Sequence, residues 1–459
     1  MLGINEKLKS LENQGKTINI AIAGIGQMGS GIISHLEKMK SFKILALGDK
    51  NLSNSVKKLT GLGYQESDIY SVEKNNHDDL INSKIKISAD ILRSETINDP
   101  NIHKSEINKA VNAGKTILTN DLAVLSHVED VDVIVDATGN PEAGAQIAIH
   151  GLLNRKHIIT LNVETDTAIG PLLKKIADNR KVVYSVAAGD EPAALKELYD
   201  FANALNLEVI AAGKGKNNPL NRQANPATLK EYAEAKGASI KMMTSFVDGT
   251  KSMVEMACFS NSTGIIPDCR GMHAPEADLK DLTTVFCLKK DGGILDKKGI
   301  VDFVIGNVAP GVFLVYTTEQ EALKKELKYL LYGNGPNYLL YRPFHLASIE
   351  APLSIARAYF YNEPTIASKN GLVSEVVTAA KKDLKPGEII DGIGGYSVYG
   401  LIETYHNAKQ ENLLPIGLCE GAAVKKEIKK GEIIKYDDVD INEDSIIYKL
   451  RKLQEILIN

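Results

Sequence analysis

The most informative stretch of this chain is INIAIAGIGQMGSG, at residues 18–31. It predicts a short apolar strand that runs into Gly-x-Gly-x-x-Gly and continues as an amphipathic helix. In this pattern Gly24 permits a tight turn, Gly26 lets a pyrophosphate approach the backbone, and Gly29 lets the helix pack against the strand. The helix N-terminus adds free N–H groups and a positive dipole. The stretch therefore predicts a dinucleotide-binding fold, against the alternative of a tight turn without a ligand.

The predicted second strand, residues 43–48, ends at Asp49. Asp49 lies 20 residues after Gly29, where a carboxylate would accept a hydrogen bond from a ribose 2′-OH and repel a 2′-phosphate. The neighbouring Lys50 would offset that repulsion. The sequence therefore predicts NAD or NADP as the cofactor and leaves the choice between them open.

A third strand, residues 131–138, is an apolar run of the buried parallel type and ends in Gly-Asn-Pro. Ligands of open α/β sheets bind beyond the C-terminal ends of the strands, so Thr138, Gly139 and Asn140 are expected to line the nicotinamide. The alternative is an ordinary turn in which Asn140 caps the next helix. The full set of predicted cofactor-binding residues is Gly24, Gly26, Gln27, Met28, Gly29, Asp49, Lys50, Thr138, Gly139 and Asn140.

Strand patterns alternate with helical patterns up to about residue 205, as in a doubly wound parallel sheet. Mixed helices, strands and loops follow. We predict an α/β fold with a Rossmann domain at residues 1–206, an inserted mixed α+β substrate domain at 207–345, and residues 346–370 returning to the first domain. Further strands are expected at 116–119, 157–162, 182–187 and 207–212, and helices at 102–113, 142–154, 167–179, 191–205, 226–236 and 351–360, after a polar, helix-prone region that reaches about residue 90.

The last part of the chain contains an internal repeat. LKPGEII at residues 384–390 recurs as IKKGEII at residues 428–434. Each copy is turn chemistry followed by a short strand, which predicts a small module of β-hairpins at residues 371–459. The alternative is a chance repeat of a common turn.

Composition narrows the class of protein. The chain has 459 residues, 44% of them hydrophobic, and a formal net charge of −4, which gives no attraction to nucleic acid or anionic membrane. No signal peptide or membrane-spanning run is recognisable, and the four cysteines lack CxxC spacing. We expect a cytoplasmic homo-oligomer that binds a small-molecule substrate and neither nucleic acid nor membrane.

Two lysines are the leading catalytic candidates. Lys214 and Lys216 flank Gly215 just after the predicted strand 207–212. From a loop there, both ammonium groups would reach a cleft, polarise a carbonyl or hold a phosphate, and a desolvated lysine would serve as acid or base. The alternative is a solvated loop pair.

Two predicted loops each contain an arginine followed three residues later by a histidine. His273 follows Arg270, and Arg342 precedes His345. Arginine suits bidentate binding of a carboxylate or phosphate, and histidine titrates near neutral pH. We therefore include His273, Arg342 and His345 among the catalytic candidates, although a single histidine is more often structural.

Several motifs together resemble the homoserine-dehydrogenase-like oxidoreductases that carry a SAF (β-clip) domain. They are GIGQMG at 24–29, DATGNP at 136–141, LNVETD at 161–166, FVDGTKSMVEM at 246–256, and KGEII with DDV in the tail. The resemblance covers nearly the whole chain. It implies a Rossmann domain, NAD or NADP, and a SAF-like module, and this family includes the DXR-like reductoisomerase.

The resemblance implies an NAD(P)-dependent reductase or reductoisomerase that acts on a small polyhydroxylated carbonyl compound. The implied reactions are conversion of 1-deoxy-D-xylulose 5-phosphate to 2-C-methyl-D-erythritol 4-phosphate, in isoprenoid biosynthesis, or reduction of a branched sugar acid. The superfamily commonly has a lysine where this chain has Asp121. That departure counts against the alternative of a homoserine dehydrogenase. A non-catalytic, dinucleotide-dependent binding protein is a second alternative.

The resemblance also gives meaning to Asp248, Lys251 and Glu255. Taken alone, Lys251 and Glu255 are spaced as a surface ion pair on a helix, and Asp248 as its cap. With the resemblance, all three are expected at the substrate, and Asp248 and Glu255 become candidate ligands of Mg²⁺ or Mn²⁺.

Overall fold

The computed structural model describes residues 3–73, 87, 104–216 and 218–458. It consists of two compact units, each with its own sheet. Unit 1 comprises Met1–Gly189, Leu346–Ala367 and Glu443–Asn459, and unit 2 comprises Asp190–His345 and Ser368–Asn442.

Unit 1 contains a seven-stranded sheet within the described residues, in the order β3-β4-β2-β1-β5-β6-β7, and every neighbouring pair is parallel. Six of these strands follow the order of a doubly wound sheet, with β3 added at one edge. The chain reverses its direction of travel between β1 and β5, which is where such sheets bind ligands. The predicted Rossmann fold class is confirmed. The strands are β1 (Ile18–Ala23), β2 (Phe42–Gly48), β3 (Ile69–Val72), β4 (Thr116–Thr119), β5 (Val133–Asp136), β6 (His157–Thr160) and β7 (Tyr184–Val186).

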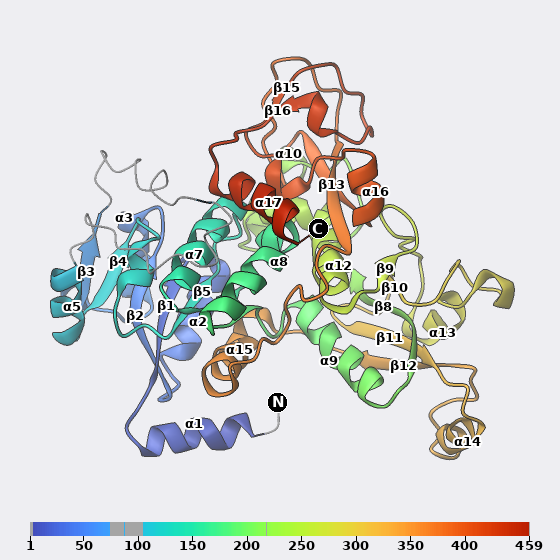
Figure 1. Ribbon diagram of the computed structural model, residues 1–459, viewed down its shortest axis with the longest axis horizontal. Coiled ribbons are helices and arrows are strands. Elements are labelled where there is room, and N and C mark those ends of the chain that lie inside the picture. The colour runs from blue at the N-terminus through green and yellow to red at the C-terminus, as the bar shows by residue number, and fades with distance from the viewer. Residues whose placement is uncertain (1–2, 74–86, 88–103, 217, 459) are drawn as a thin grey trace. The chain divides into compact units, whose positions relative to one another are not determined.

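Helices flank this sheet (Figure 1). α2 packs against β1 and β2 and against α15, whereas α7 and α8 pack against β5, β6 and β7 and against the C-terminal helix α17. Apolar residues of both faces are buried, as expected for parallel strands covered on each side. The helices of unit 1 are α1 (Ile4–Asn13), α2 (Gln27–Leu36), α3 (Leu52–Gly61), α5 (Lys104–Asn112), α6 (Val124–His127), α7 (Pro141–Leu153), α8 (Val163–Arg180), α15 (Ala347–Tyr361) and α17 (Ile446–Leu457).

Some elements differ from the sequence-based expectation. β3 falls in the region expected to be helix-prone, because it is a strand of four residues at the sheet edge, none of them fully buried, and so carries no buried apolar run. Most of that region beyond residue 73 lies outside the described residues. α8 begins at Val163 rather than near 167, because the Asn162 side chain accepts a hydrogen bond from Thr165 N and starts the helix earlier.

The unit boundaries also differ from the predicted domain boundaries. α9 (Glu191–Ala204) groups with unit 2, whereas residues 1–206 were expected to form the first domain. α17 groups with unit 1 rather than with the β module. Its Gln454 accepts a hydrogen bond from Leu172 N and donates one to Ala168 O, which ties the end of the chain to α8.

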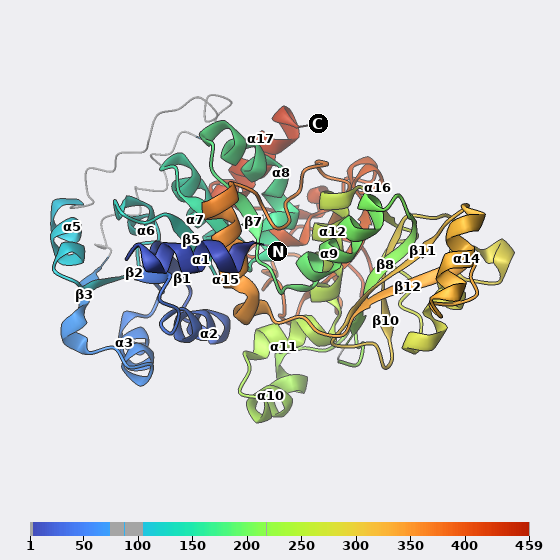
Figure 2. The ribbon, with the colours of Figure 1, turned by 90° about the horizontal axis from the view of Figure 1, so that it is seen from below.

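Unit 2 is built on a mixed five-stranded sheet in the order β12-β11-β8-β10-β9 (Figure 2). β8 is parallel to β10 and antiparallel to β11. α9 packs on β8, β11 and β12, and α12 packs on α9 and β10. The elements are β8 (Glu208–Lys216), β9 (Ile266–Pro267), β10 (Ile300–Ile305), β11 (Val312–Thr317) and β12 (Asn337–Arg342), with α9, α10 (Pro226–Ala235), α11 (Ile240–Val247), α12 (Thr250–Thr263), α13 (Leu282–Val285) and α14 (Glu321–Tyr329).

Residues 368–442 of unit 2 form small antiparallel pairs. β13 (Ser374–Ala380) pairs with β14 (Val398–Thr404), and β15 (Ala423–Val424) pairs with β16 (Val439–Asp440); α16 (Tyr405–Gln410) follows β14. The two copies of the repeat meet, since Leu384 and Ile428 exchange backbone hydrogen bonds of 2.8 and 3.0 Å. The repeat therefore marks two facing arms of one module. None of the described helices is long and apolar enough to cross a membrane.

Candidate active site

The dinucleotide loop, residues 24–29, has the geometry that its glycines predict. Gly24 has a φ of +91°, and a Cβ there would lie 2.7 Å from the backbone of Ala137. A Cβ on Gly29 would lie 1.8 Å from Gly24 O, so α2 packs directly on the turn. A Cβ on Gly26 would meet nothing within 4 Å. The backbone at Gly26 is therefore open to the approach of a pyrophosphate. At Gly24 and Gly29, by contrast, close packing leaves no room for a side chain.

The N-terminus of α2 provides the donors of this loop. Gly26 is the N-cap residue, and no side chain accepts a hydrogen bond from the first turn among the described residues. Gln27 is exposed and Met28 is half-buried. The free N–H groups and the helix dipole fit the pyrophosphate of NAD(P).

Asp49 and Lys50 lie in different environments at the end of β2. Asp49 Oδ2 accepts a hydrogen bond of 2.8 Å from Ile25 N, and its Oδ1 accepts one of 3.1 Å from Asn51 N. The carboxylate thus holds the dinucleotide loop in place. Lys50 is exposed and lines a pocket of about 440 Å³, together with Asn51, Leu52, Ser53, Glu73 and Asn120.

The end of β5 is organised by hydrogen bonds. Thr138 donates to Asp136 Oδ1 from its backbone N at 3.0 Å and from its hydroxyl at 2.6 Å, and Gly139 has a φ of +64°. Asn140 Oδ1 accepts from Ala143 N, so Asn140 caps α7, and Asn162 Nδ2 donates to Asn140 O at 2.8 Å. The capping role is present, and the predicted contact of these residues with the nicotinamide stays a prediction.

Lys214 and Lys216 lie within strand β8, not in a loop after it. The strand extends through them because β10 and β11 pair with it on both sides as far as Lys216 and Lys214. Glycines at 213 and 215 alternate with them, and a Cβ on Gly213 would lie 2.2 Å from Asp302 O. Alternation along the strand therefore places both lysine side chains on the same face of the sheet.

A group of buried charged side chains surrounds Lys214. Its Nζ lies 2.5 Å from Glu191 Oε1 at the start of α9, and it also donates to Glu255 Oε2 in α12. All three side chains are buried: Lys214 is 8% exposed, Glu191 12% and Glu255 2%. Asp190 is buried beside them, and we call Asp190, Glu191, Lys214 and Glu255 the lysine–carboxylate cluster. His345 Nε2 approaches Glu191 Oε1 at 3.4 Å.

The pKa values of the four cluster residues are shifted in different directions. Burial, with the Glu191 charge, raises the pKa of Glu255 to about 6 despite Lys214 and Lys251. Burial raises the pKa of Asp190 well above its usual range. For Glu191, burial favours the neutral acid, but Lys214 and His345 outweigh it and the pKa is lowered. For Lys214, the two glutamates outweigh burial and raise the pKa.

Lys216 has a different environment from its neighbour on the strand. It is buried, and its Nζ donates to the backbone carbonyl of Phe246. Burial and the nearby Lys214 charge lower the pKa of Lys216 to about 8. Lys214 is therefore a permanent cation, whereas Lys216 can exchange a proton near neutral pH.

Asp190 and Glu191 are missing from the sequence-based candidates. They come after the short turn 187–189 that follows β7, and they begin α9, with Asp190 at the N-cap position. The same reasoning that selected Thr138, a polar residue beyond the end of a parallel strand, would have selected both. Lys251 is half-buried, and its charge acts on Asp190 and Glu255, so it lies near the cluster, while its expected contact with the substrate stays a prediction.

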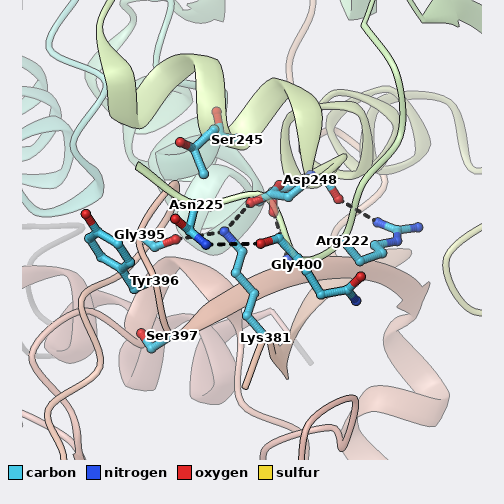
Figure 3. A network of polar contacts seen from close by, with 12 residues as sticks. Arg222, Asn225, Ser245, Asp248, Lys381, Gly395, Tyr396, Ser397 and Gly400 are labelled. Carbon is cyan, nitrogen blue, oxygen red and sulfur yellow. Dashed lines mark hydrogen bonds and ion pairs between the residues drawn. The ribbon is translucent and has the colours of Figure 1, made fainter. Parts of the chain in front are cut away.

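Asp248 lies in a separate network and not among the clustered carboxylates (Figure 3). Its Oδ2 lies 2.8 Å from Lys381 Nζ, and its Oδ1 accepts from Thr250 N at 2.8 Å. Lys381 also donates to Gly395 O at 2.8 Å, and Arg222 donates to Asp248 O at 3.1 Å. The pairing of Asp248 with Glu255 as metal ligands has no support in this geometry, because Lys381 already neutralises Asp248.

His273 and Arg342 are also engaged elsewhere in unit 2. His273 Nδ1 lies 2.9 Å from Asp302 Oδ2, and its Nε2 lies 3.5 Å from Asp268 Oδ2. The hydrogen bond to Asp302 raises the pKa of His273. Arg342 pairs with Glu197 at 3.1 Å and lies over the Phe344 ring. The structure thus brings Lys214, Lys251, Glu255 and His345 together, and places His273, Arg342 and Asp248 in other contacts.

The carboxylates of the cluster are of the kind that bind a divalent metal. Ligand oxygens of Asp190, Glu191 and Glu255 lie within 4.8 Å of one another, a donor set that hard cations accept. However, the Lys214 ammonium is already bonded to both glutamates. A metal ion bound to Glu191 and Glu255 would have to displace it, so the cluster does not fit a metal while Lys214 is in place.

Two family matches divide the chain. Residues 24–181 match the family described as homoserine dehydrogenase, NAD binding domain, and residues 189–351 match the family described as oxidoreductase DRL, catalytic domain. No curated protein sequence matches the chain.

Several solved structures are similar at low identity. A DOX-P reductoisomerase in complex with magnesium is 13% identical, with 76% of this chain and 70% of that chain covered and a TM-score of 0.38. The 1-deoxy-D-xylulose 5-phosphate reductoisomerase from Zymomonas mobilis, in complex with NADPH, is 13% identical, with coverages of 52% and 57% and a TM-score of 0.33. The scyllo-inositol dehydrogenase from Lactobacillus casei, with NAD(H) and scyllo-inositol, is 13% identical, with coverages of 71% and 76% and a TM-score of 0.35.

The family matches agree with the geometry of each unit. The NAD-binding match covers the dinucleotide loop and the end of β5, and the oxidoreductase match covers all four members of the lysine–carboxylate cluster. The chain is thus an NAD(P)-dependent oxidoreductase, and its two family matches fit a homoserine-dehydrogenase-like oxidoreductase.

Proposed function

We propose that the enzyme reduces the carbonyl group of a small polyhydroxylated compound, with Lys214 and Lys216 as its chemical centre. The observation that carries this proposal is the contrast between two buried lysines on one face of β8. One is held between two glutamates, and the other bonds a backbone carbonyl.

Bound NAD(P)H supplies the hydride that reduces the carbonyl carbon. Lys214 stabilises the negative charge that develops on the carbonyl oxygen, because a fixed cation in a dry site needs no reorganisation during the reaction. Lys216 gives a proton to that oxygen and is restored from solvent. Glu255, Lys251 and His345 set the charge around Lys214, and the other candidates, Asp248, His273 and Arg342, act as positioning residues.

The substrate class follows from the charges near Lys216. The charge of Arg222 contributes to the lowered pKa of Lys216, so the two cations lie near each other; Lys216 is buried and Arg222 is half-buried. Such a pair suits an anionic group on the substrate, a phosphate or a carboxylate. We propose a reductoisomerase acting on 1-deoxy-D-xylulose 5-phosphate, or a reductase of a branched sugar acid, with the tail serving as a SAF-like module.

The test is oxidation of NADH and NADPH, followed by absorbance, over a panel of ketose phosphates and branched sugar acids. The wild-type enzyme and Lys214→Met are compared for each compound. Turnover with a phosphate or sugar acid that falls about 1,000-fold in Lys214→Met supports the proposal. Turnover that survives the substitution overturns the role of Lys214.

Homoserine dehydrogenase is the second candidate, favoured by the family match over residues 24–181. The same panel includes homoserine with NAD and NADP. Oxidation of homoserine in preference to every sugar compound would replace the proposed reaction. Tight cofactor binding without turnover of any compound would instead favour a dinucleotide-dependent binding protein.

A further inference from the structure

Lys214 lies where a divalent cation would have to bind. Its ammonium bonds one oxygen of Glu191 and one of Glu255, and a third carboxylate, Asp190, has a ligand oxygen within 4.8 Å of theirs. Magnesium sites use such oxygens at about 2.0–2.1 Å, so a metal and the ammonium would compete for the same carboxylates.

The charges of the cluster are balanced without a metal. Burial raises the pKa of Asp190 well above its usual range, which favours the neutral acid, and Asp190 Oδ1 accepts a hydrogen bond of 3.2 Å from Glu191 N. The two ionised glutamates then face two cations, Lys214 and Lys251. Adding a divalent cation would leave excess positive charge in a buried site, which is costly.

The ammonium also has the donor that the reaction needs. A protonated lysine has three N–H donors. Glu191 and Glu255 take two of them, and these glutamates are the hydrogen-bond partners of Lys214 among the described residues. One N–H is left to point at a carbonyl oxygen, held in direction by the other two.

We propose that Lys214 does the work that a metal ion does in metal-dependent carbonyl reduction, and that this oxidoreductase is metal-independent because its carboxylates hold an ammonium instead. The inference rests on the proposed function only for the role of the third N–H. The competition between Lys214 and a metal is a property of the cluster itself, whatever the substrate is.

The test uses Mn²⁺ alone as the probe, titrated into metal-stripped full-length protein and followed by calorimetry and by the electron paramagnetic resonance of free Mn²⁺. We expect no tight site in the wild-type protein. Lys214→Ser removes the ammonium and leaves the three carboxylates, so we expect one Mn²⁺ to bind at least about 100-fold more tightly than in wild type, a difference of about 2.7 kcal/mol.

Two control variants test whether the gained Mn²⁺ site depends on the removal of Lys214 and on the carboxylates. Lys216→Ser removes a lysine from the same face of β8 but leaves Lys214, so it should gain no site. Lys214→Ser combined with Glu255→Gln should lose the gained site. Thermal unfolding of each variant is compared with wild type, and the wild-type titration decides the question even if a variant fails to fold.

One tight Mn²⁺ in the wild-type protein, lost in Glu255→Gln, would overturn the proposal. So would a substrate from the panel whose turnover stops in metal-stripped enzyme and returns with Mg²⁺ or Mn²⁺. If no compound of the panel reacts, the proposed substrate class fails, while the binding measurements still decide between ammonium and metal.

Discussion

The dinucleotide loop of unit 1 and the lysine–carboxylate cluster of unit 2 both hold charge, but they use different groups. The loop offers backbone N–H groups at Gly26 and the start of α2, with the nearest side chains removed by glycine. The cluster uses the side chains of Glu191, Lys214 and Glu255, buried and mutually neutralised. A backbone site tolerates no added atoms, whereas a side-chain site tolerates no missing partner. The two sites therefore differ in what breaks them.

The largest effect is expected from the charged interior of unit 2, at the Asp248–Lys381 pair. Both side chains are buried, with exposures of 0% and 2%, and the ion pair is 2.8 Å long. Lys381→Met leaves Asp248 as an uncompensated buried charge and should lower the free energy of unfolding by about 3–5 kcal/mol. Urea unfolding measures this loss.

The matched control is the neighbouring Lys382→Met, because Lys382 is half-exposed and pairs with Glu388 at the surface. We expect no measurable loss there. Equal stability of Lys381→Met and Lys382→Met would show that the buried pair contributes nothing.

The next effect concerns the dinucleotide loop. Gly26→Ala places a methyl group in open space that the pyrophosphate must enter, so we expect unchanged thermal stability and NADPH affinity weakened about 100-fold, or about 2.7 kcal/mol. Gly29→Ala should lower both stability and affinity, because its Cβ would lie 1.8 Å from Gly24 O.

Fluorescence titration with NADPH and thermal unfolding measure both properties. Gly61→Ala is the control, since Gly61 has an ordinary φ and a Cβ there meets nothing within 4 Å. Unaltered NADPH affinity in Gly26→Ala would mean that the loop does not carry the pyrophosphate.

A third effect distinguishes the two lysines of β8 by pH. The pKa of Lys216 is lowered to about 8, and its ammonium form must donate the proton in carbonyl reduction. The rate of reduction should therefore be level below about pH 8 and fall about tenfold per pH unit above it, while oxidation of the product should rise over the same range.

The pH profile of kcat/KM for the substrate found by the panel measures this. In Lys216→Met the break near pH 8 should vanish and the level rate should be lower. If the break in the pH profile of Lys216→Met stays near pH 8, another group transfers the proton.

The smallest effect is on the choice of cofactor. Asp49 is held by Ile25 N and Asn51 N, and Lys50 lines the open pocket beside it. We expect Lys50→Glu to weaken NADPH about tenfold relative to NADH, or about 1.4 kcal/mol, because the new carboxylate repels a 2′-phosphate.

Dissociation constants of both cofactors check the result. Lys9→Glu, on α1, makes the same change of charge without lining the pocket and should leave the ratio unchanged. If the ratio of the two dissociation constants changed equally in both variants, the effect would come from net charge and not from the position of Lys50.

The sequence by itself determined the parts of this protein that depend on local spacing. Gly24, Gly26 and Gly29 act within six residues, so their turn, opening and packing contact follow from the chain's own geometry. The alternation of apolar strands with helices likewise predicted the parallel sheet, because each βαβ connection is made by neighbouring segments. The edge strand β3 escaped this reasoning since it carries no buried apolar run.

Only the tertiary structure decided how the distant charges pair. Lys214 meets Glu191 and Glu255 across separations of 23 and 41 residues, and Lys381 rather than Glu255 is the partner of Asp248. No local pattern specifies these contacts, because they depend on how β8, α9 and α12 pack. The same packing extended β8 through Lys214 and Lys216, and it separated a permanently charged lysine from one that can give up its proton.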